Sequence, residues 1–358
     1  MPQRRIPCLL MRGGTSKATC FLHKDLPAST RQRDAVLLSV MGSPDPRQID
    51  GIGGADPLTS KVAIVKPSSH ADCDVDYLFA QVKIDQAWVD YGQNCGNILA
   101  AVGAFALERN LVALTPPLTP VRVFMENTGQ RVIVNVPCDS DGVLYQGNVH
   151  IAGVPGSAGG IELFFPSLTT DDPRLAFPTG QKRESILDID VTCINNGMPV
   201  VLLCANALGL QGHEPPELLE QDGALMQKID AIRLAAGERM GLGEVSQRSV
   251  PKVVLLSTSG VANRIITRSF SAQRCHRAIG VFAAISVASA LLTPGTLGAD
   301  FTAPPTTTSI TVDLQHPSGV LSIDVALSPE GLLLGCHLLR TARLLFAGEV
   351  MIPAHVWP

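Results

Sequence analysis

The chain has 358 residues, more than one domain usually contains, so two domains of about 150–200 residues are expected. Hydrophobic residues make up 46% of the chain, charged residues 17%, and the net charge is −4, a composition that fits a compact soluble enzyme and excludes a disordered chain. With no basic stripe and only 4% aromatic residues, the chain lacks the groups that binding of nucleic acid requires.

The apolar runs and the cysteines indicate where the protein works. The N-terminal apolar run is too short for a signal peptide and predicts a first strand. The longest run, 278–292, falls short of the ~20 residues of a membrane span and predicts a buried helix. Nine cysteines without a CxxC pair argue against a disulfide framework and a zinc site. We therefore expect a cytoplasmic protein without a metal that does not enter a membrane.

Strand-like runs, rich in β-branched residues and bounded by Gly, Pro or Asn, occupy much of the chain and predict a mostly antiparallel sheet. In chain order these runs are 5–11, 61–65, 74–84, 120–125, 131–137, 252–256, 309–314, 320–327 and 344–352. A charged segment at 214–239 predicts one or two surface helices.

Two helices are predicted at 97–109 and 276–292, and both are apolar nearly all round, so each must be buried on every side. A sheet curled around a central helix meets that requirement. Cys95 and Cys275 precede these helices and lie about half the chain apart. We therefore predict an α+β fold with two pseudo-symmetric domains, each a mostly antiparallel β-barrel around one helix, with a cysteine at each helix N-terminus.

The domain boundaries follow from the same pattern. We expect an N-terminal domain at 1–175 and a C-terminal domain at 176–358, and leave open whether the last strand returns to the first domain. Asp171, Asp172 and Pro173 mark the predicted linker.

Cys95 lies between a polar turn and the first predicted helix. A thiol in the first helical turn faces the positive end of the helix dipole and free N–H groups, which lower its pKa from ~8.5 towards neutrality. Gly96 lets a ligand approach the backbone, and Asn94 and Asn97 can cap the helix or bind a carboxylate. The alternative is that Cys95 is a small core residue.

Lys61 begins an apolar strand after a glycine turn and the residues Thr59 and Ser60. An ammonium held against apolar surface can act in proton transfer. The alternative is a lysine that protects a sheet edge or extends to solvent. The glycines and hydroxyls beside Lys61 favour the functional interpretation.

Two further clusters of cations can bind anions. Arg12, Ser16 and Lys17 lie in MRGGTSK, which offers a cation, backbone donors and hydroxyls, although the same residues also form ordinary turns. Arg274 and His276 lie at the predicted start of the second helix, where cations oppose the dipole; they are carboxylate ligands or solvated surface charges. The chain contains no GxxxxGK[ST] or GxGxxG sequence, so no nucleotide cofactor is expected.

Five stretches, in this order across nearly the whole chain, resemble the 2-methylaconitate cis-trans isomerase family. They are MRGGTSK, DGIGGADPLTSKVAIV, YGQNCGN, FPTG and QRCHRAIG. That family has the diaminopimelate epimerase fold, with two barrel-around-helix halves. One departure is Ala18, where a glycine often follows the lysine of MRGGTSK.

The resemblance implies a cofactor-independent isomerase that shifts a double bond of 4-oxalomesaconate by allylic 1,3-proton transfer, in the degradation of lignin-derived aromatics through gallate or protocatechuate. It implies a homodimer, a small tricarboxylate substrate, and Cys95 and Lys61 as the proton-transferring pair. The substrate-binding residues that it implies are Arg12, Ser16, Lys17, Thr59, Ser60, Arg274 and His276. The residues around Cys95, which are Asn94, Gly96 and Asn97, complete the predicted substrate-binding set.

Three other functions stay open from the sequence. The first is isomerisation of 2-methylaconitate, which is also a small unsaturated polycarboxylate. The second is a racemase or epimerase in which Cys275 faces Cys95. The third is a carboxylate-binding protein without catalysis, against which the Cys95 and Lys61 pair argues.

Overall fold

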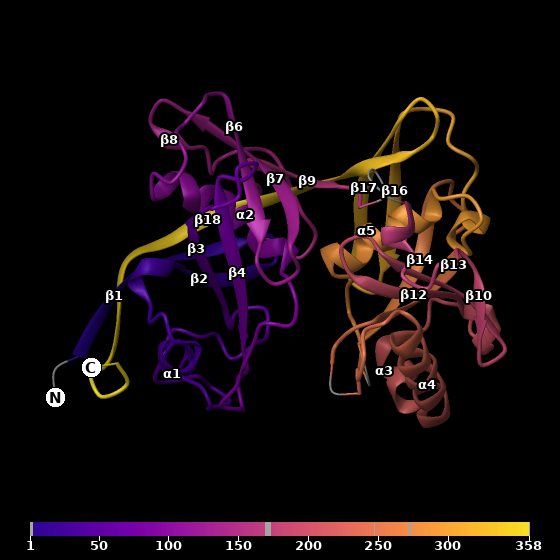
Figure 1. Ribbon diagram of the computed structural model, residues 1–358, viewed down its shortest axis with the longest axis horizontal. Coiled ribbons are helices and arrows are strands. Elements are labelled where there is room, and N and C mark those ends of the chain that lie inside the picture. The colour runs from indigo at the N-terminus through magenta and orange to yellow at the C-terminus, as the bar shows by residue number, and fades with distance from the viewer. Residues whose placement is uncertain (1–2, 169–172, 247, 272–273, 358) are drawn as a thin grey trace. The chain divides into compact units, whose positions relative to one another are not determined.

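The structure is a computed structural model that describes residues 3–168, 173–246, 248–271 and 274–357. The chain divides into two compact units, Met1–Phe164 with Leu339–Pro358, and Phe165–Leu338 (Figure 1). The C-terminal segment therefore returns to the first unit. The predicted linker residues Asp171 and Asp172 lie outside the described residues, and the domain boundary after residue 175 stays a prediction.

The first unit consists of a curled sheet with one helix on each face. Its strands are β1 (Gln3–Gly13), β2 (Ser16–Leu22), β3 (Lys61–Pro67), β4 (Val75–Val82), β5 (Val89–Asp90), β6 (Leu118–Met125), β7 (Gln130–Asp139), β8 (Gly142–Val143), most of β9 (Gly160–Pro166) and the end of β18 (Leu333–Pro353). Its helices are η1 (His23–Asp25), α1 (Thr30–Met41) and α2 (Gly96–Glu108).

Strand pairing closes the sheet of the first unit into a barrel. The pairs run β1–β2–β3–β4–β6–β7–β9–β18 and return to β1. Pairs β2–β3 and β4–β6 are parallel, whereas β1–β2, β3–β4, β6–β7 and β1–β18 are antiparallel. The mostly antiparallel barrel predicted for the first half is thus present.

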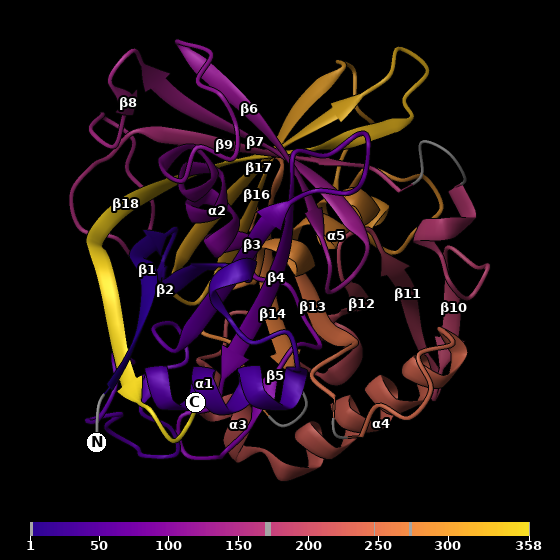
Figure 2. The ribbon, with the colours of Figure 1, turned by 60° about the vertical axis from the view of Figure 1, so that its left-hand side comes forward.

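The two faces of this sheet have different partners. Side chains such as Phe21, Val62, Ile64 and Ala80 pack with Val36 and other residues of α1 in one apolar core. Since successive side chains of a strand point to opposite faces, residues in between face α2. Figures 1 and 2 both show β2 and β3 between the two helices. These two sides are the α1 face and the α2 face of the sheet.

The helix α2 is the predicted central helix of the first unit. Eleven of its 13 residues are buried, and it contacts β1, β2, β3, β6, β7 and β8. Gly103 allows the close approach to β7, because a Cβ there would lie 2.4 Å from Val134 Cγ1. Its observed start at Gly96 agrees with the predicted range 97–109 within one residue.

The second unit repeats this plan around α5 (Val281–Leu291), of which every residue is buried. Its strands are β10 (Glu184–Ile186), β11 (Ile189–Asn195), β12 (Pro199–Cys204), β13 (Lys252–Thr258), β14 (Arg264–Ser271), β15 (Arg274–Cys275), β16 (Ser309–His316), β17 (Gly319–Leu327) and the start of β18. Its other helices are η2 (Pro173–Ala176), η3 (Ala205–Leu208), α3 (Pro216–Gln221), α4 (Gly223–Arg239) and η4 (Gly298–Phe301). The charged segment 214–239 thus contains two helices, as predicted.

The pairing order confirms the pseudo-repeat. The series antiparallel β1–β2, parallel β2–β3, antiparallel β3–β4 and parallel β4–β6 recurs as β11–β12, β12–β13, β13–β14 and β14–β16. Lys61 and Lys252 begin the equivalent strands β3 and β13, and each is 7% exposed. The helices α1 and α4 are likewise equivalent, because α4 packs on the side chains of β12 and β13 in a second apolar core.

The predicted start of the second helix is wrong, and so is the prediction that Cys275 lies at the N-terminus of that helix. Arg274 and Cys275 form β15, paired with β14, and the N–H of His276 donates to the Ser269 carbonyl, so this backbone is part of the sheet. The N-cap of α5 is Gly280, which is the structural equivalent of Cys95. Cys275 instead belongs to the core around α4.

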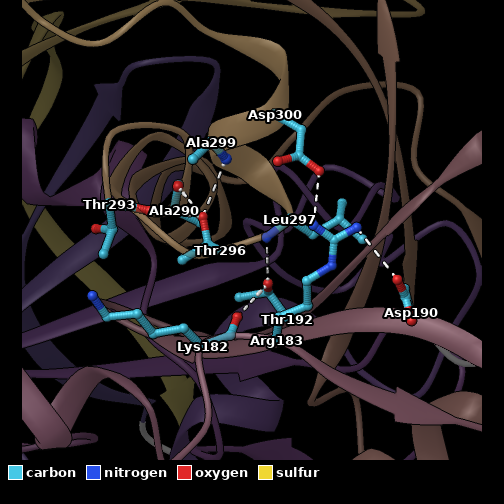
Figure 3. Close-up of polar contacts among 10 residues, drawn as sticks. All are labelled: Lys182, Arg183, Asp190, Thr192, Ala290, Thr293, Thr296, Leu297, Ala299 and Asp300. Carbon is cyan, nitrogen blue, oxygen red and sulfur yellow. Dashed lines mark hydrogen bonds and ion pairs between the residues drawn. The ribbon is translucent and has the colours of Figure 1, made fainter.

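Hydroxyl groups hold the C-terminal end of α5 (Figure 3). Thr296 Oγ1 donates to the Ala290 carbonyl at 2.6 Å, which satisfies one of the last helical acceptors. The N–H of Leu297 donates to Thr192 Oγ1 on β11 at 2.9 Å. Arg183 forms ion pairs with Asp300 at 2.8 Å and with Asp190 at 3.3 Å. The segment after α5 is thereby attached to β11 and its neighbours.

None of the helices within the described part of the chain is long and apolar enough to span a membrane.

Candidate active site

Cys95 is the N-cap of α2 and is half-buried. Its backbone is extended, its carbonyl accepts the first helical hydrogen bond from Leu99, and no side chain caps the first turn. The thiol therefore lies beside backbone N–H groups that have no partner within the helix. The predicted position of Cys95 at a helix N-terminus is confirmed.

Lys61 lies on the α2 face of β3 among neutral partners. Its Nζ donates to Gln81 Oε1 at 2.7 Å and lies 5.1 Å from the centroid of the Phe79 ring. Gln81 is held in turn, because its Nε2 donates to the carbonyls of Pro57 and Ser60. Across the described residues no carboxylate lies within ion-pair distance of Lys61. A buried ammonium without a carboxylate partner is suited to an anionic ligand.

The two hydroxyls before Lys61 already have protein partners. Ser60 is fully buried, donates to the Val82 carbonyl at 2.9 Å and accepts from Gln48 Nε2 at 2.8 Å. Thr59 Oγ1 donates to the Asp56 carbonyl at 3.1 Å. These bonds hold the turn that leads into β3, and contact of either hydroxyl with a substrate stays a prediction.

The turn between β1 and β2 packs on the first turn of α2. A Cβ on Gly13 would lie 2.5 Å from the Asn97 carbonyl oxygen. Gly14 has a φ of +52°, and a Cβ there would lie 2.3 Å from Asn97 Oδ1, so this position requires glycine. Asn97 Nδ2 donates to Thr15 Oγ1 at 3.1 Å. Ala18, the departure from the family pattern, lies inside β2 opposite Lys61.

The predicted residues of this turn point to two faces. The side chains of Arg12 and Cys8 point to one side of β1, and those of Lys17 and Phe21 point to one side of β2. Since Cys8 and Phe21 face α1, Arg12 and Lys17 also face α1. Ser16 alternates with them and faces α2. Ser16 is 2% exposed, and its hydroxyl has no hydrogen-bond partner in the described structure.

Asn94 and Gly96 flank Cys95 in the chain. Asn94 is buried, and its Nδ2 donates to Thr128 Oγ1 at 2.6 Å, whereas its Oδ1 has no partner within the described chain. Gly96 is the first residue of α2 and is buried. Unsatisfied buried polar atoms are rare in proteins, so Ser16 Oγ and Asn94 Oδ1 are available to a polar ligand.

Arg274 and His276 belong to the second unit. Both are exposed, and they lie in and directly after β15, not at the N-terminus of α5. The two cations therefore do not lie in the first turn of α5. Their contact with a substrate stays a prediction.

Three residues on the α2 face of the first unit were not predicted from the sequence. Gln81 holds Lys61, and its alternation with Phe79 in β4 could have shown that both face one side. Tyr77, on the same face, has a fully buried hydroxyl without a partner among the described residues; burial raises its pKa well above the usual value, and the nearby Cys95 raises it further. Arg340 of β18 donates from Nε to Asn97 Oδ1 at 3.3 Å.

No cluster of three or more His, Cys, Asp or Glu side chains that could hold a metal occurs in residues 3–168, 173–246, 248–271 and 274–357.

Comparisons with known proteins match the whole chain. A family model described as PrpF protein matches residues 3–353. The 4-oxalomesaconate tautomerase of Pseudomonas putida is 54% identical over 357 residues, which are 100% of this chain and 99% of that protein. The (4E)-oxalomesaconate Delta-isomerase of Novosphingobium sp. is 47% identical, over 97% of each chain. The crystal structure of a methylitaconate-delta-isomerase has a TM-score of 0.84 and 32% identity, covering 99% of this chain and 97% of that one. The two-domain fold predicted from the sequence is confirmed.

Proposed function

This chain belongs to the PrpF family, and on that premise we propose that it is an isomerase that shifts a double bond of 4-oxalomesaconate by allylic 1,3-proton transfer. One observation carries the proposal. The half-buried thiol of Cys95 lies at the N-terminus of α2. The buried ammonium of Lys61 lies on the sheet face that α2 covers, and its partners in the described chain are neutral. A proton acceptor and a proton donor thus belong to one unit.

The substrate makes the reaction accessible to weak bases. 4-Oxalomesaconate has a methylene group between a ketone and an alkene, so loss of one methylene proton gives a dienolate with delocalised charge. Cys95 as thiolate takes this proton, because the N–H groups at the start of α2 stabilise negative charge on the sulfur. Lys61 as ammonium delivers a proton to the far end of the dienolate, and the double bond moves.

The surroundings favour an anionic intermediate. The ammonium of Lys61 and the first-turn N–H groups of α2 are fixed before the reaction, and preorganised donors of this kind lower the barrier most effectively. The open polar atoms of Ser16 and Asn94 supply further contacts for a polar substrate. The proposed steps need no cofactor, because every proton moves to or from a side chain.

A racemase that uses two thiols is disfavoured by the repeat. In such an enzyme the second thiol would be expected at the position equivalent to Cys95, and that position is Gly280. Cys275 is buried in the core around α4, and burial raises its pKa to about 12. A thiol in this state is a poor proton acceptor at neutral pH.

The cellular context is part of the same proposal. We infer that the protein is cytoplasmic, serves the degradation of lignin-derived aromatics through gallate or protocatechuate cleavage, and forms a homodimer. The names of the two most similar relatives above support the substrate. Exposed apolar side chains on β18, including Leu345, Phe346 and Met351, support self-association, which light scattering of the purified protein tests.

Hydrogen exchange with solvent tests the roles of the pair. In D₂O, Cys95→Ser should stop exchange at the methylene beside the ketone, because a serine hydroxyl is far less acidic than a thiol. Lys61→Met should stop exchange at the far carbon and leave the first exchange measurable. Isomerisation should fall roughly 100-fold or more in both variants, as expected for loss of a general acid or base.

The chain offers a control residue of the same type for each substitution. Cys204→Ser changes another half-buried cysteine, in the second unit, and Lys66→Met changes a lysine of β3 that pairs with Glu126 instead of facing α2. Both controls should exchange at both carbons at the wild-type rate. Proton NMR of the product and recovered substrate reads both positions. If Cys95→Ser or Lys61→Met retained exchange at both carbons, the assignment of that residue would be wrong.

A further inference from the structure

Arg340 is a cation with neutral partners on the α2 face of the first unit. Its Nε donates to Asn97 Oδ1 at 3.3 Å and its Nη1 donates to the Leu339 carbonyl at 2.8 Å. No carboxylate in the described ranges lies within ion-pair distance, and Nη2 has no hydrogen-bond partner there. Arg340 is half-buried, and removal from water lowers its pKa to about 10, a shift that no acidic side chain among the described residues offsets.

Helix stability does not explain this position. Asn97 is the second residue of α2, and a guanidinium near a helix N-terminus opposes the dipole. A bound anion removes the conflict, since both the guanidinium and the helix N-terminus attract negative charge. Asn97 has a second role here, because its amide joins Thr15 of the β1–β2 turn to Arg340.

Ser16 provides an independent indication of a ligand. Its hydroxyl is buried and without a partner among the described residues. Ser16 pairs with Gly13, and Gly13 pairs with Ala342, two residues after Arg340 on β18. All four residues face α2, since Gly13 contacts Asn97 and Ala101 and strand residues two apart share a face. An unused donor and an uncompensated cation therefore lie on one face at the start of α2.

Three cations at the β1–β2 turn and on β18 lie on the opposite face. Arg12 pairs with Lys17 on β2 and with Arg343 on β18, which forms a row of three cations. Arg12 Nη1 is already used, because it donates to the carbonyls of Gly14 and Thr341 and to Thr341 Oγ1. Arg12 thus secures the turn to β18, and Arg340 is the arginine directed to α2.

We propose that Arg340 and Ser16 form a carboxylate subsite that binds one carboxylate of the substrate at the start of α2, with Asn97 orienting the guanidinium. Nη2 of Arg340 and the Ser16 hydroxyl are the donors that bind the carboxylate oxygens. The proposal rests on the proposed function, because it places this subsite on the face that carries Lys61. It makes Arg340 a determinant of binding for polycarboxylates.

Binding of tricarballylate, a saturated tricarboxylate that cannot isomerise, tests the subsite by calorimetry. Arg340→Gln should weaken binding roughly 10- to 100-fold, the range for loss of a charge-assisted hydrogen bond. Arg340→Lys should recover part of the affinity, since it restores the charge without the planar fork. Arg343→Gln, three residues later on the same strand and on the other face, is the matched control and should bind as the wild type does.

Ser16→Ala keeps the test decisive where Arg340 variants fold poorly. The Ser16 hydroxyl has no partner in the described chain, so its loss should leave the melting temperature unchanged while weakening tricarballylate binding several-fold. A wild-type protein that does not bind tricarballylate overturns the subsite. Equal affinity of Arg340→Gln and Arg343→Gln for tricarballylate also overturns it. If Arg340→Gln does not fold, equal affinity of Ser16→Ala and Arg343→Gln overturns it instead.

Turnover of 4-oxalomesaconate by the same preparations separates the two proposals. A wild-type protein that binds tricarballylate through Arg340 but does not isomerise 4-oxalomesaconate contradicts the proposed function and supports the subsite. A protein that isomerises 4-oxalomesaconate with the same KM in wild type and Arg340→Gln supports the function and contradicts the subsite.

Discussion

The thiols of Cys95 and Cys275 differ in their surroundings, although each residue precedes an apolar helix. Cys95 is half-buried at the N-cap of α2. Cys275 is 6% exposed in the core around α4, where burial raises its pKa to about 12 from an ordinary value of 9.0. The raised pKa favours the protonated form of Cys275 at neutral pH.

Replacement of Cys275 tests whether the second cysteine takes part in the reaction. Cys275→Ala should retain the turnover of the wild type within about two-fold, with a stability loss of about 1 kcal/mol for the vacated core volume. In the native wild type, iodoacetamide should modify Cys95 before Cys275 between pH 7 and about pH 9, as peptide mass spectrometry would show. A large loss of turnover in a folded Cys275→Ala variant would instead support the two-cysteine racemase.

The sequence pointed to some residues of the site and not to others for local reasons. Cys95 and Lys61 could be predicted because each stands out against its own neighbours, a thiol before an apolar helix and a lysine in an apolar strand. Arg340 could not be predicted in this way. A second arginine, Arg343, lies three residues later, and only the pairing of β18 with β1 brings Arg340 to Asn97, 243 residues away.

At the scale of elements, the two central helices show the same contrast. The start of α2 could be predicted because a polar turn and a glycine precede it. The start of α5 could not, since the apolar pattern extends through residues 278–280 while the backbone at 274–275 pairs with β14. Because β15 pairs with β14, the helix begins at Val281, five residues after the predicted start at residue 276.

The glycine in the middle of α2 is predicted to be necessary for packing. Gly103→Ala places a Cβ 2.4 Å from Val134 Cγ1 and 2.9 Å from Val136 Cγ2, so β7 must shift. Overpacking costs about 1–3 kcal/mol, whereas the helix propensity of alanine returns at most about 1 kcal/mol. Urea unfolding should therefore show a less stable variant.

Gly223 at the start of α4 provides the control for this substitution. A Cβ at Gly223 meets no described atom within 4 Å, and alanine there should leave stability unchanged or raise it slightly. If Gly103→Ala were as stable as Gly223→Ala, the close contact of α2 with β7 would not limit the packing of the first unit.

At the scale of the whole molecule, the repeat retains the lysine and loses the thiol. Lys61 and Lys252 begin equivalent strands, and each donates to a neutral side chain opposite it, Gln81 Oε1 and Ser271 Oγ, both at 2.7 Å. Cys95 has Gly280 as its equivalent. The two units are therefore alike in fold and different in the residue that precedes the central helix, and a thiol at only one of these two helices suits proton transfer between two carbons better than inversion of one.

Turnover by the purified wild-type protein tests the central claim most directly. The protein should be added to 4-oxalomesaconate and, separately, to 2-methylaconitate in D₂O, and both reactions followed by proton NMR. We predict that 4-oxalomesaconate is isomerised with a kcat/KM roughly 100-fold higher or more, equivalent to about 2.7 kcal/mol of preferential transition-state binding, and that its product contains deuterium at the newly protonated carbon. Faster conversion of 2-methylaconitate, or no conversion of 4-oxalomesaconate, would contradict the account.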